Sequence, residues 1–449
     1  MHVPADDTIA ALATAVGTGA IAIVRISGRD ARAIAARVLG RVPTPRVAEL
    51  CVLKSRAGEE IDQGLALFFP APDSYTGEDV IELQCHGSPI VVAWLLETLY
   101  GHGARAAEPG EFTQRAFLND KLDLAQAEAV ADLITAGSRR AAQAALRSLG
   151  GELSTRVTSA QQKLTELRAL CEAWLDFPEE DLDGGAQAEL AARASALEAE
   201  LAALEAQAAQ GAVLHDGLSL AIAGEPNAGK SSLLNRLAGY DAAIVTDVPG
   251  TTRDAIRERL SLDGIPLEIV DTAGLRPTHD PVEREGVRRA QREIDVADHV
   301  LWVADIRKGL DAALASAAVA LPPDAQFTIV LNKLDLVVNR APAVSAGAPT
   351  VLAISALTGE GTRELVEHLK KLAGWNESVG GTFSARRRHV DALARTRAHV
   401  GRACPEFPKR LEIAAEELRG AQAALGELTG EVTSDDLLGE IFATFCIGK

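Results

Sequence analysis

The segment from Gly224 to Ser232 places glycines, a lysine and two serines at the spacing of a phosphate-binding loop, G-x-x-x-x-G-K-S. The apolar run before it, 218–223, predicts a buried strand, and residues 233–237 after it have helical spacing. Glycines let backbone N–H groups surround an anion, and the N-terminus of the following helix adds the positive end of its dipole. This order favours a nucleotide loop over a chance glycine-rich turn.

The polar residues of this loop have expected roles. Lys230 would reach the terminal phosphates, and the Ser231 hydroxyl would hold a magnesium ion. The side chain of Asn227 could coordinate a monovalent cation beside the phosphates, where positive charge stabilises developing negative charge. The candidate nucleotide contacts of the loop are Asn227, Ala228, Gly229, Lys230, Ser231 and Ser232.

Two later segments could complete the magnesium site. Thr252 follows Pro249-Gly250, and we assign its hydroxyl to the magnesium shell. The strand predicted at 267–270 runs into Asp271-Thr272-Ala273-Gly274. In this turn Asp271 would act on the metal through a water, and the Gly274 amide would sense the γ-phosphate.

The segment Asn332-Lys333-Leu334-Asp335 predicts which base is bound. The Asp335 carboxylate can accept hydrogen bonds from both the ring N–H and the amino group of guanine, and adenine offers no such pair of donors. The backbone of Ser355-Ala356-Leu357 could contact the guanine oxygen. Taken alone, residues 332–335 are also typical of a polar turn between a strand and a helix. Their position after the other motifs favours a guanine-nucleotide-binding domain and a GTPase.

Leu275 excludes one route to hydrolysis. Ras-like enzymes place a glutamine directly after the Asp-x-x-Gly turn to orient the attacking water, and leucine cannot hold a water. Another polar group, internal or external, must do so. The charged residues that follow are either the source of that group or the solvated start of a helix. They are Arg276, Asp280, Glu283, Arg284 and Glu285.

A chain of 449 residues is too long for one ordinary hydrophobic core, and the pattern of residue types changes along its length. Residues 1–117 are typical of an α/β domain, and 118–213 of the first part of a helical domain. Residues 214–374 alternate strands and helices, which predicts a Ras-like G domain with a mostly parallel sheet. Residues 375–449 are the second part of the helical domain, so the G domain is predicted to be inserted within it. The fold class is multidomain α/β and α.

Periodicity predicts the individual elements. A helix running through 122–133 would be capped by Asn119 or Asp120. In the first domain, strands are expected at 21–28, 64–69 and 79–87, with a helix at 91–100. In the G domain, strands are expected at 218–223, 267–270, 299–303, 328–331 and 350–354. Further helices are expected at 186–210, 386–402 and 409–428.

Bulk properties narrow the class of protein. The net charge of −18 disfavours non-specific nucleic-acid binding, so an RNA substrate would need a local basic patch or a partner. The basic clusters Arg139-Arg140 and Arg386-Arg387-Arg388 are more typical of solvated helix faces. Five scattered cysteines without C-x-x-C disfavour a disulfide framework or a zinc site. No apolar run could span a bilayer and no signal peptide is apparent, so we expect a cytoplasmic protein with no membrane partner.

Five stretches outside the nucleotide motifs resemble the MnmE (TrmE) family of bacterial tRNA modification GTPases, and the resemblance covers essentially the whole chain. They are Val24-Arg25-Ile26-Ser27-Gly28, Tyr75-Thr76-Gly77-Glu78-Asp79, Pro109-Gly110-Glu111-Phe112-Thr113, Arg115-Ala116-Phe117-Leu118-Asn119-Asp120-Lys121-Leu122-Asp123-Leu124 and Cys446-Ile447-Gly448-Lys449.

The resemblance implies that the N-terminal domain binds 5-formyl-tetrahydrofolate or a related tetrahydrofolate and mediates dimerisation. By motif match, Arg25, Glu82, Lys121 and Lys449 would line the folate pocket. Cations suit the folate's glutamate carboxylate, and a carboxylate such as Glu82 suits the N–H groups of a pterin edge. Without the resemblance, these residues read as ordinary strand-face and helix-start positions.

The resemblance also implies potassium-dependent GTP hydrolysis. Asn227 would bind K⁺ together with oxygens of Thr246, Val248 and Thr251, in the loop Thr246-Asp247-Val248-Pro249-Gly250-Thr251. Relatives are also expected to carry alanine at the position of Pro249, and the proline would stiffen this loop. The match Val282-Glu283-Arg284 selects Glu283 as the catalytic residue that orients water. Two G domains of a homodimer would meet across their potassium loops.

The family's process adds an aminomethyl or carboxymethylaminomethyl group to C5 of the wobble uridine of certain tRNAs. It uses an FAD-dependent partner that takes NADH, in a heterotetramer-type complex. Cys446 is then a possible functional thiol near the modification centre, or else a buried apolar thiol beside Phe442 and Phe445. The alternative function is a ribosome-assembly or signalling GTPase switch without modification activity. The residues that separate these two functions are the first 120 or so and the last four, because both functions share the nucleotide motifs.

Overall fold

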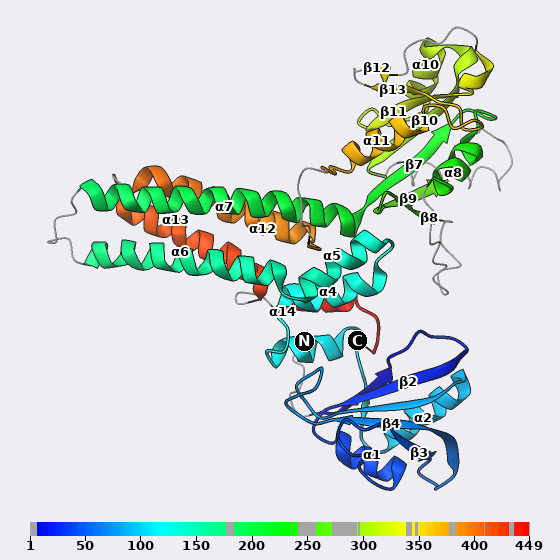
Figure 1. Ribbon diagram of the computed structural model, residues 1–449, viewed down its shortest axis with the longest axis vertical. Coiled ribbons are helices and arrows are strands. Elements are labelled where there is room, and N and C mark those ends of the chain that lie inside the picture. The colour runs from blue at the N-terminus through cyan, green and yellow to red at the C-terminus, as the bar shows by residue number, and fades with distance from the viewer. Residues whose placement is uncertain are drawn as a thin grey trace. The chain divides into compact units, whose positions relative to one another are not determined.

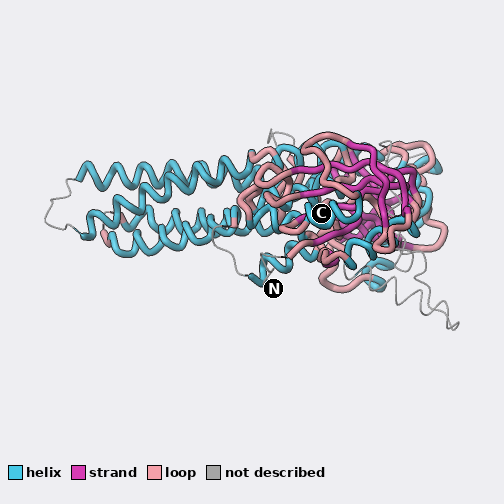
Figure 2. Tube along the Cα trace, turned by 90° about the horizontal axis from the view of Figure 1, so that it is seen from below, coloured by secondary structure: helices cyan, strands magenta, loops and turns pink. Residues whose placement is uncertain are grey.

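The computed structural model describes residues 7–176, 184–240, 257–271, 294, 297–337, 344–345, 349–376, 383–407, 409–430 and 435–448. Within them the strands lie at 9–106 and 218–353, and the segments between and after these ranges are helical (Figure 2). Contacts divide the chain into two compact units, one of residues 1–131, 149–195 and 398–449 and one of residues 132–148 and 196–397. The three domain boundaries expected from the sequence, after residues 117, 213 and 374, stay predictions.

In the first unit, six strands form one sheet in the order β3-β4-β5-β2-β1-β6 (Figure 1). Only β1 and β6 pair in parallel, and the other neighbours are antiparallel. The strands are β1 (Ile9–Leu12), β2 (Gly19–Ser27), β3 (Glu49–Lys54), β4 (Glu60–Phe69), β5 (Val80–Gly87) and β6 (Arg105–Ala106). The predicted strands at 21–28, 64–69 and 79–87 are confirmed as β2, β4 and β5, whereas β1, β3 and β6 were not predicted.

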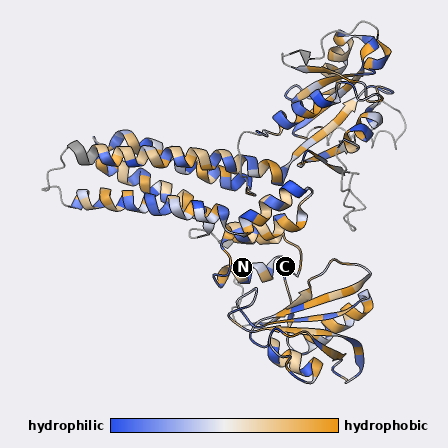
Figure 3. Cartoon of the chain, in the orientation of Figure 1, coloured by the Kyte–Doolittle hydropathy of each residue, from blue (hydrophilic) through white to orange (hydrophobic). Residues whose placement is uncertain are grey.

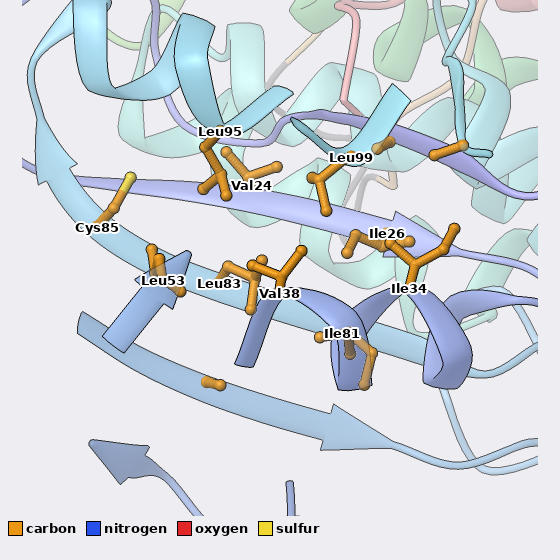
Figure 4. Packing of buried hydrophobic residues seen from close by; sticks show 14 of the residues in the cluster. Val24, Ile26, Ile34, Val38, Leu53, Ile81, Leu83, Cys85, Leu95 and Leu99 are labelled. Atoms are coloured by element: carbon orange, nitrogen blue, oxygen red, sulfur yellow. The ribbon is translucent and has the colours of Figure 1, made fainter. Parts of the chain in front are cut away.

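Helices α1 (Ala31–Leu39) and α2 (Pro89–Gly101) cover one face of this sheet. The predicted helix at 91–100 is confirmed as α2, which begins after Ser88 with Pro89 in its first turn. Figure 4 shows the core between the helices and the strands. Its fully buried side chains include Val24, Ile26, Ile34, Val38, Leu53, Ile81, Leu83, Leu95 and Leu99.

The opposite face of the sheet is open along β3 and β4, where it carries exposed apolar side chains, and Phe112 of α3 (Glu111–Leu118) covers it at β1. The strand register aligns Leu50 with Leu65, Leu65 with Gln84, and Gln84 with Ile23. Directly paired residues share a face, as do residues two apart on one strand. The pair Arg25 and Glu82 therefore lies on this same face, with side chains only 21% and 17% exposed. Leu50 remains 72% exposed.

Apart from the helices that cover the two sheets, the described α-helices are α3 (Glu111–Leu118), α4 (Leu124–Thr135), α5 (Arg139–Leu149), α6 (Glu152–Asp176), α7 (Gly184–Asp216), α12 (Arg387–Ala403), α13 (Leu411–Thr429) and α14 (Asp435–Ala443). The long helices mix polar and apolar residues, whereas apolar residues gather on the strands of both sheets (Figure 3). In the first unit α6 packs along α13, and Arg168 donates to Gln422 across this contact at 2.6 Å.

The predicted cap of α4 was wrong. The side chain of Asp123 accepts the backbone N–H of Gln126 at 2.8 Å, so Asp123 caps the helix. Asn119 instead donates its side-chain amide to the carbonyl of Thr76, and Asp120 lies in a turn with a positive φ of 55°. The predicted helices at 186–210, 386–402 and 409–428 are confirmed as α7, α12 and α13, and α7 is longer at both ends.

In the second unit, seven strands form a sheet in the order β12-β13-β11-β10-β7-β9-β8. The strands are β7 (Leu218–Gly224), β8 (Arg257–Leu262), β9 (Ile265–Asp271), β10 (His299–Asp305), β11 (Phe327–Asn332), β12 (Val344–Ser345) and β13 (Thr350–Ala353). The inner pairs are parallel, and the edge strands β8 and β12 pair antiparallel. All five strands predicted in this part are confirmed. Helices cover both faces of this sheet. One buried cluster lies under α8 (Lys230–Ala238) and α11 (Thr362–Leu372), and another lies under α10 (Leu310–Ala320).

Both connections of this sheet to the helices meet one carboxylate within the second unit. Asp132 of α4 pairs with His215, near the end of α7, at 3.1 Å, and with Arg386, just before α12, at 2.9 Å. It also accepts the hydroxyl of Ser384. Burial opposes protonation of His215, but hydrogen bonds to Asp132 and Asp216 outweigh it and raise the pKa of His215 to about 9. Arg386 is thus bound to a buried acid, which corrects the expectation of a solvated face there.

Among the described residues, no helix is both long enough and apolar enough to cross a membrane.

Candidate functional site

The predicted phosphate loop joins β7 to α8. β7 ends at Gly224 and α8 begins at Lys230, with Gly229 as its N-cap. Gly224 and Gly229 have φ of +141° and +96°, and an added Cβ would approach the Val303 carbonyl oxygen to 2.1 Å or the Asn332 side chain to 2.3 Å. Both glycines are therefore required by backbone conformation and by space. The loop brings backbone amides to the positive end of a helix, which is the arrangement that binds phosphates.

The polar side chains of the loop divide into held and exposed groups. Lys230 donates its ammonium to the carbonyls of Gly224 and Glu225, at 2.9 and 3.0 Å. Asn227 is exposed and has a φ of +60°. The hydroxyl-bearing residues Ser231 and Ser232 are exposed at the start of α8. Hydroxyls in this position fit a hard cation such as Mg²⁺, which prefers oxygen ligands.

Asn332 links the phosphate loop to the segment 355–357, which the sequence predicts to contact the base. It is the last residue of β11 and only 3% exposed. Its side-chain amide donates to the carbonyl of Ala228 at 2.8 Å, and its side-chain oxygen accepts the backbone N–H of Ala356 at 2.9 Å. One asparagine thereby joins three segments that are far apart in the chain.

Asp335 presents a carboxylate beside this junction. The residue is exposed, and the hydroxyl of Ser355 donates to one of its oxygens at 2.5 Å. The segment 355–357 is held to α8, because Arg236 donates to the carbonyls of Ala356 and Leu357. A cavity of about 470 Å³ opens alongside and is lined by Ser232, Asn235, Arg236, Gly239, Tyr240, Ala356 and Leu357.

Part of the predicted nucleotide site lies outside the described residues. The backbone of Asp271 is placed at the end of β9, in register with Ile222 of β7. The candidates that fall outside the description are Thr246, Asp247, Val248, Pro249, Gly250, Thr251, Thr252, Thr272, Ala273, Gly274 and Glu283. The potassium ligands other than Asn227, the Thr252 ligand and the catalytic glutamate therefore stay predictions.

Arg25 and Glu82 form an ion pair on the open face of the N-terminal sheet. The register pairs them across β2 and β5, with 2.9 Å between a guanidinium nitrogen and a carboxylate oxygen. The guanidinium lies 5.5 Å from the ring centre of Tyr75 and 5.7 Å from that of Phe112. Tyr75 is fixed by a 2.8 Å hydrogen bond to Thr113. The result is a charged pair framed by two aromatic rings, which can bind a flat polar heterocycle.

Lys121 lies beside the loop that carries Tyr75. Its aliphatic stem packs against Gly77, where an added Cβ would lie 3.4 Å from the lysine Cε. Its backbone N–H donates to Ala116 at the end of α3. Three of the four predicted folate residues are thus described, and Arg25 and Lys121 both border the segment 75–77.

A buried ion network that the sequence did not predict supports this arrangement. Arg115 is only 3% exposed and contacts Asp7, Glu78 and Glu111. Arg105 binds Asp7 and Glu111 from the other side. Burial raises the pKa of the Glu111 carboxyl, but hydrogen bonds from Arg105 and Arg115 reverse this and hold it below its usual range. Arg115 and Glu111 lie inside the stretches that carried the resemblance, which was the available signal.

The C-terminal segment packs on the same domain within the first unit. Ile447 forms an antiparallel bridge with Pro109, and the carbonyl of Cys446 accepts the N–H of Gly110 at 3.3 Å. At Gly448, with φ of +95°, an added Cβ would lie 2.0 Å from the carbonyl oxygen of Leu12. The backbone before Lys449 is therefore held against the end of β1. Lys449 itself lies outside the described residues, and Cys446 is an exposed free thiol.

Comparisons with known proteins cover the whole length of the chain. The family described as the GTP-binding protein TrmE N-terminus matches residues 8–121, and the MnmE helical domain matches residues 124–446. The tRNA modification GTPase MnmE of Nitrosococcus oceani is 50% identical over 466 aligned residues, covering 100% of both chains. That of Alkalilimnicola ehrlichii is 51% identical, covering 99% of this chain and 100% of the relative.

Solved structures also match, over parts of the chain. Aquifex aeolicus Era is 24% identical, with a TM-score of 0.29, and the match covers 40% of this chain and 66% of Era. The G domain of the T. maritima FeoB iron transporter is 24% identical, with a TM-score of 0.26, covering 35% and 98%. The full-length identity near 50% and the two family matches, 8–121 and 124–446, establish that this chain belongs to the MnmE/TrmE family.

Proposed function

We propose that this chain is a GTP hydrolase that acts in tRNA modification, driven by potassium-dependent hydrolysis and supplied with a one-carbon unit by a tetrahydrofolate. The single observation that carries the nucleotide part is Asn332, which joins the phosphate loop at Ala228 to the base-reading segment at Ala356. The tRNA modification part comes from family membership.

Guanine is the base that fits the polar groups. Asp335 offers an exposed carboxylate for the paired ring N–H and amino donors of guanine. In the segment 355–357, the N–H groups of Ser355 and Ala356 already donate to the Glu360 carbonyl and the Asn332 side chain, so the Leu357 N–H is the proposed donor to the guanine oxygen. An adenine nucleotide would leave the Asp335 carboxylate unpaired, so the site discriminates against it strongly.

Magnesium and potassium would neutralise the phosphates. Ser231 and Thr252 are the proposed magnesium ligands, and the exposed serine at the start of α8 is consistent with this role. Asn227, with Thr246, Val248 and Thr251, is the proposed potassium site. A bound monovalent cation supplies the charge stabilisation that an arginine finger supplies elsewhere.

Glu283 is the proposed water-orienting residue, because Leu275 cannot take the role of the Ras-like glutamine. We expect the Glu283→Ala variant to keep its affinity for GTP and to lose turnover, measured by nucleotide titration and phosphate release. We expect hydrolysis in KCl to exceed hydrolysis in NaCl many-fold. Equal rates in the two salts would remove Asn227 from its role.

The N-terminal site is the proposed tetrahydrofolate pocket, formed by Arg25, Glu82, Lys121 and Lys449. The ion pair between two aromatic rings supports a pterin ring, whose edge N–H groups suit Glu82. Lys121, near the same loop, and Lys449 would suit the glutamate carboxylates of the folate. The folate carries the one-carbon unit, and these residues hold and orient it.

The open sheet face supports a homodimer. Leu50, Leu65 and Ile21 are exposed there at 72%, 37% and 63%, on a sheet whose other face is covered. Apolar exposure of this kind marks interaction surfaces. The net charge of −18 supports a division of labour, in which the FAD- and NADH-dependent partner of a heterotetramer-type complex supplies most of the tRNA binding.

One titration separates this proposal from a ribosome-assembly or signalling switch. The full chain is titrated with 5-formyl-tetrahydrofolate by calorimetry, with folate-free buffer as the blank. We expect saturable binding at one site per chain. A rival switch would need no folate, and the absence of binding would reject the modification function while leaving the GTPase assignment intact.

A further inference from the structure

Asp305 occupies a place in the nucleotide domain that no motif predicted. It is the last residue of β10, and the parallel register aligns it with Asn332 at the end of β11. It is only 7% exposed. Carboxylates are seldom buried to this extent unless they are paired.

The partner that matters is Lys333. Its ammonium lies 2.8 Å from a carboxylate oxygen of Asp305. Lys333 directly follows Asn332, which joins the phosphate loop to the segment 355–357. It lies two residues before Asp335, the proposed contact of the guanine base. Its φ of +69° is in the left-handed region, which turns the chain sharply at the strand end.

Asp305 is itself held in place from the solvent side. The guanidinium of Arg307 donates to both carboxylate oxygens at 2.9 and 2.6 Å, and the Arg307 backbone N–H donates at 3.1 Å. These hydrogen bonds, with that from Lys333, outweigh burial and hold the pKa of Asp305 well below its usual range. Asp305 is therefore a fixed anion rather than a titrating group.

A fixed anion matters to a lysine beside a base. The lysine side chain has four carbons of flexible stem that can cover an aromatic ring and an ammonium that interacts with its face. A free lysine would lose much rotational freedom when a nucleotide orders it, and that loss weakens binding. A partner that orders the lysine beforehand removes most of this cost.

We propose that Asp305 is a positioning residue of the guanine-nucleotide site, which orders Lys333 before the nucleotide arrives and thereby slows nucleotide release. The inference rests on the proposed nucleotide site. It differs from a merely structural role, in which Asp305 would only cap the short 3-10 helix 306–308 through the Arg307 backbone.

The test is a double-mutant cycle in the full chain with Asp305→Asn, Lys333→Ala and both together. Dissociation of a fluorescent GDP is measured by stopped flow, with the melting temperature of the nucleotide-free chain beside it. We expect Asp305→Asn to speed release about tenfold, the size of a lost charge-assisted hydrogen bond. The double variant should release GDP no faster than Lys333→Ala alone.

The matched control is Asp311→Asn, an exposed acid in the first turn of α10 that undergoes the same change of charge. Its release rate should equal that of the unsubstituted chain. Effects of Asp305→Asn and Lys333→Ala that multiply, or an unchanged rate in Asp305→Asn, would overturn the positioning role. Failure of the unsubstituted chain to bind GDP would instead reject the proposed nucleotide site.

Discussion

The nucleotide site and the N-terminal site of this chain are built from different kinds of contact. The first consists of loops at the carboxyl ends of parallel strands, and its ligand-facing groups are mostly backbone amides, two glycines and a few polar side chains. The second consists of side chains on one sheet face, ordered by ion pairs and aromatic rings from α3 and the 75–78 loop.

This difference decides how each site responds to change. A backbone-built loop tolerates side-chain replacement except where a glycine or a specificity group is touched. A side-chain-built site depends on each charge in its network, because a buried charge that loses its partner is costly. The two sites lie in separate compact units, so each can be altered while the other serves as the internal control.

The largest effect is expected from Asp335→Asn. The amide replaces a carboxylate that is proposed to accept two guanine donors, so affinity for GTP should fall about 10⁴-fold, the discrimination typical of a site left with unpaired groups. Affinity for xanthosine triphosphate, which has a carbonyl in place of the amino group, should rise. Competition against a fluorescent nucleotide measures both, and folate binding should be unchanged. Unaltered GTP affinity would show that Asp335 does not read the base.

An effect of intermediate size is expected on the stability of the nucleotide domain when the pH is lowered, because His299 is buried there. This histidine is 7% exposed, and Thr328 bridges it to His368 by hydrogen bonds of 2.9 and 2.8 Å. Burial, with the neighbouring His368, lowers the pKa of His299 to about 4. The unfolded chain binds this proton near pH 6.5, so the contribution to stability is complete above pH 6.5 and is lost as pH falls towards 4, about 3 kcal/mol in all.

The N-terminal domain should resist the same change of pH. The carboxyls of Asp7 and Glu111 have pKa values held below their usual range, so their contribution persists until the pH falls below that range. Hydrogen exchange in urea at pH 7 and pH 5 should show protection lost in β10 and β11 and kept in β2 and β5. His299→Gln should reduce the acid effect, and His86→Gln, at an exposed histidine, should leave it as it is. Equal acid sensitivity in the two sheets would contradict this assignment.

A smaller effect is expected from Arg25→Ala. Losing one charged hydrogen-bonding group should weaken 5-formyl-tetrahydrofolate binding about 10- to 100-fold, measured by calorimetry, with GTP affinity unaltered. Arg32→Ala is the matched control, since Arg32 also pairs with a carboxylate, Asp79, and lies 4.9 Å from the ring centre of Phe68. A loss of folate binding in both variants would indicate general damage to the domain.

The same contrast explains how much could be predicted from the sequence. The phosphate loop, Asn332 and Asp335 were predictable because each motif is contiguous and follows a strongly apolar strand. The edge strand β8 was not predicted, although Asp263-Gly264 between β8 and β9, with φ of 51° and 89°, is a two-residue hairpin signal.

The residues that could not be predicted are those whose partners are far apart in the chain. Asp305 pairs with Lys333, and Arg115 with Asp7, and no local pattern indicates either pair. In the sequence Asp132 is an ordinary helix position, and only the structure shows that it pairs with His215 and Arg386. Charge patterns alone cannot distinguish such buried arginines from solvated ones.

The insertion of the nucleotide domain has a consequence for biosynthesis. The buried residues Leu153, Val157 and Leu164 of α6 lie on a helix that packs along α13, which the ribosome makes only after the whole nucleotide domain. That domain has its own core on both faces of its sheet, so it can fold before α13 is synthesised and before α6 can pack against it. The apolar positions of α6 that pack against α13 therefore lack this partner until the whole nucleotide domain has been made.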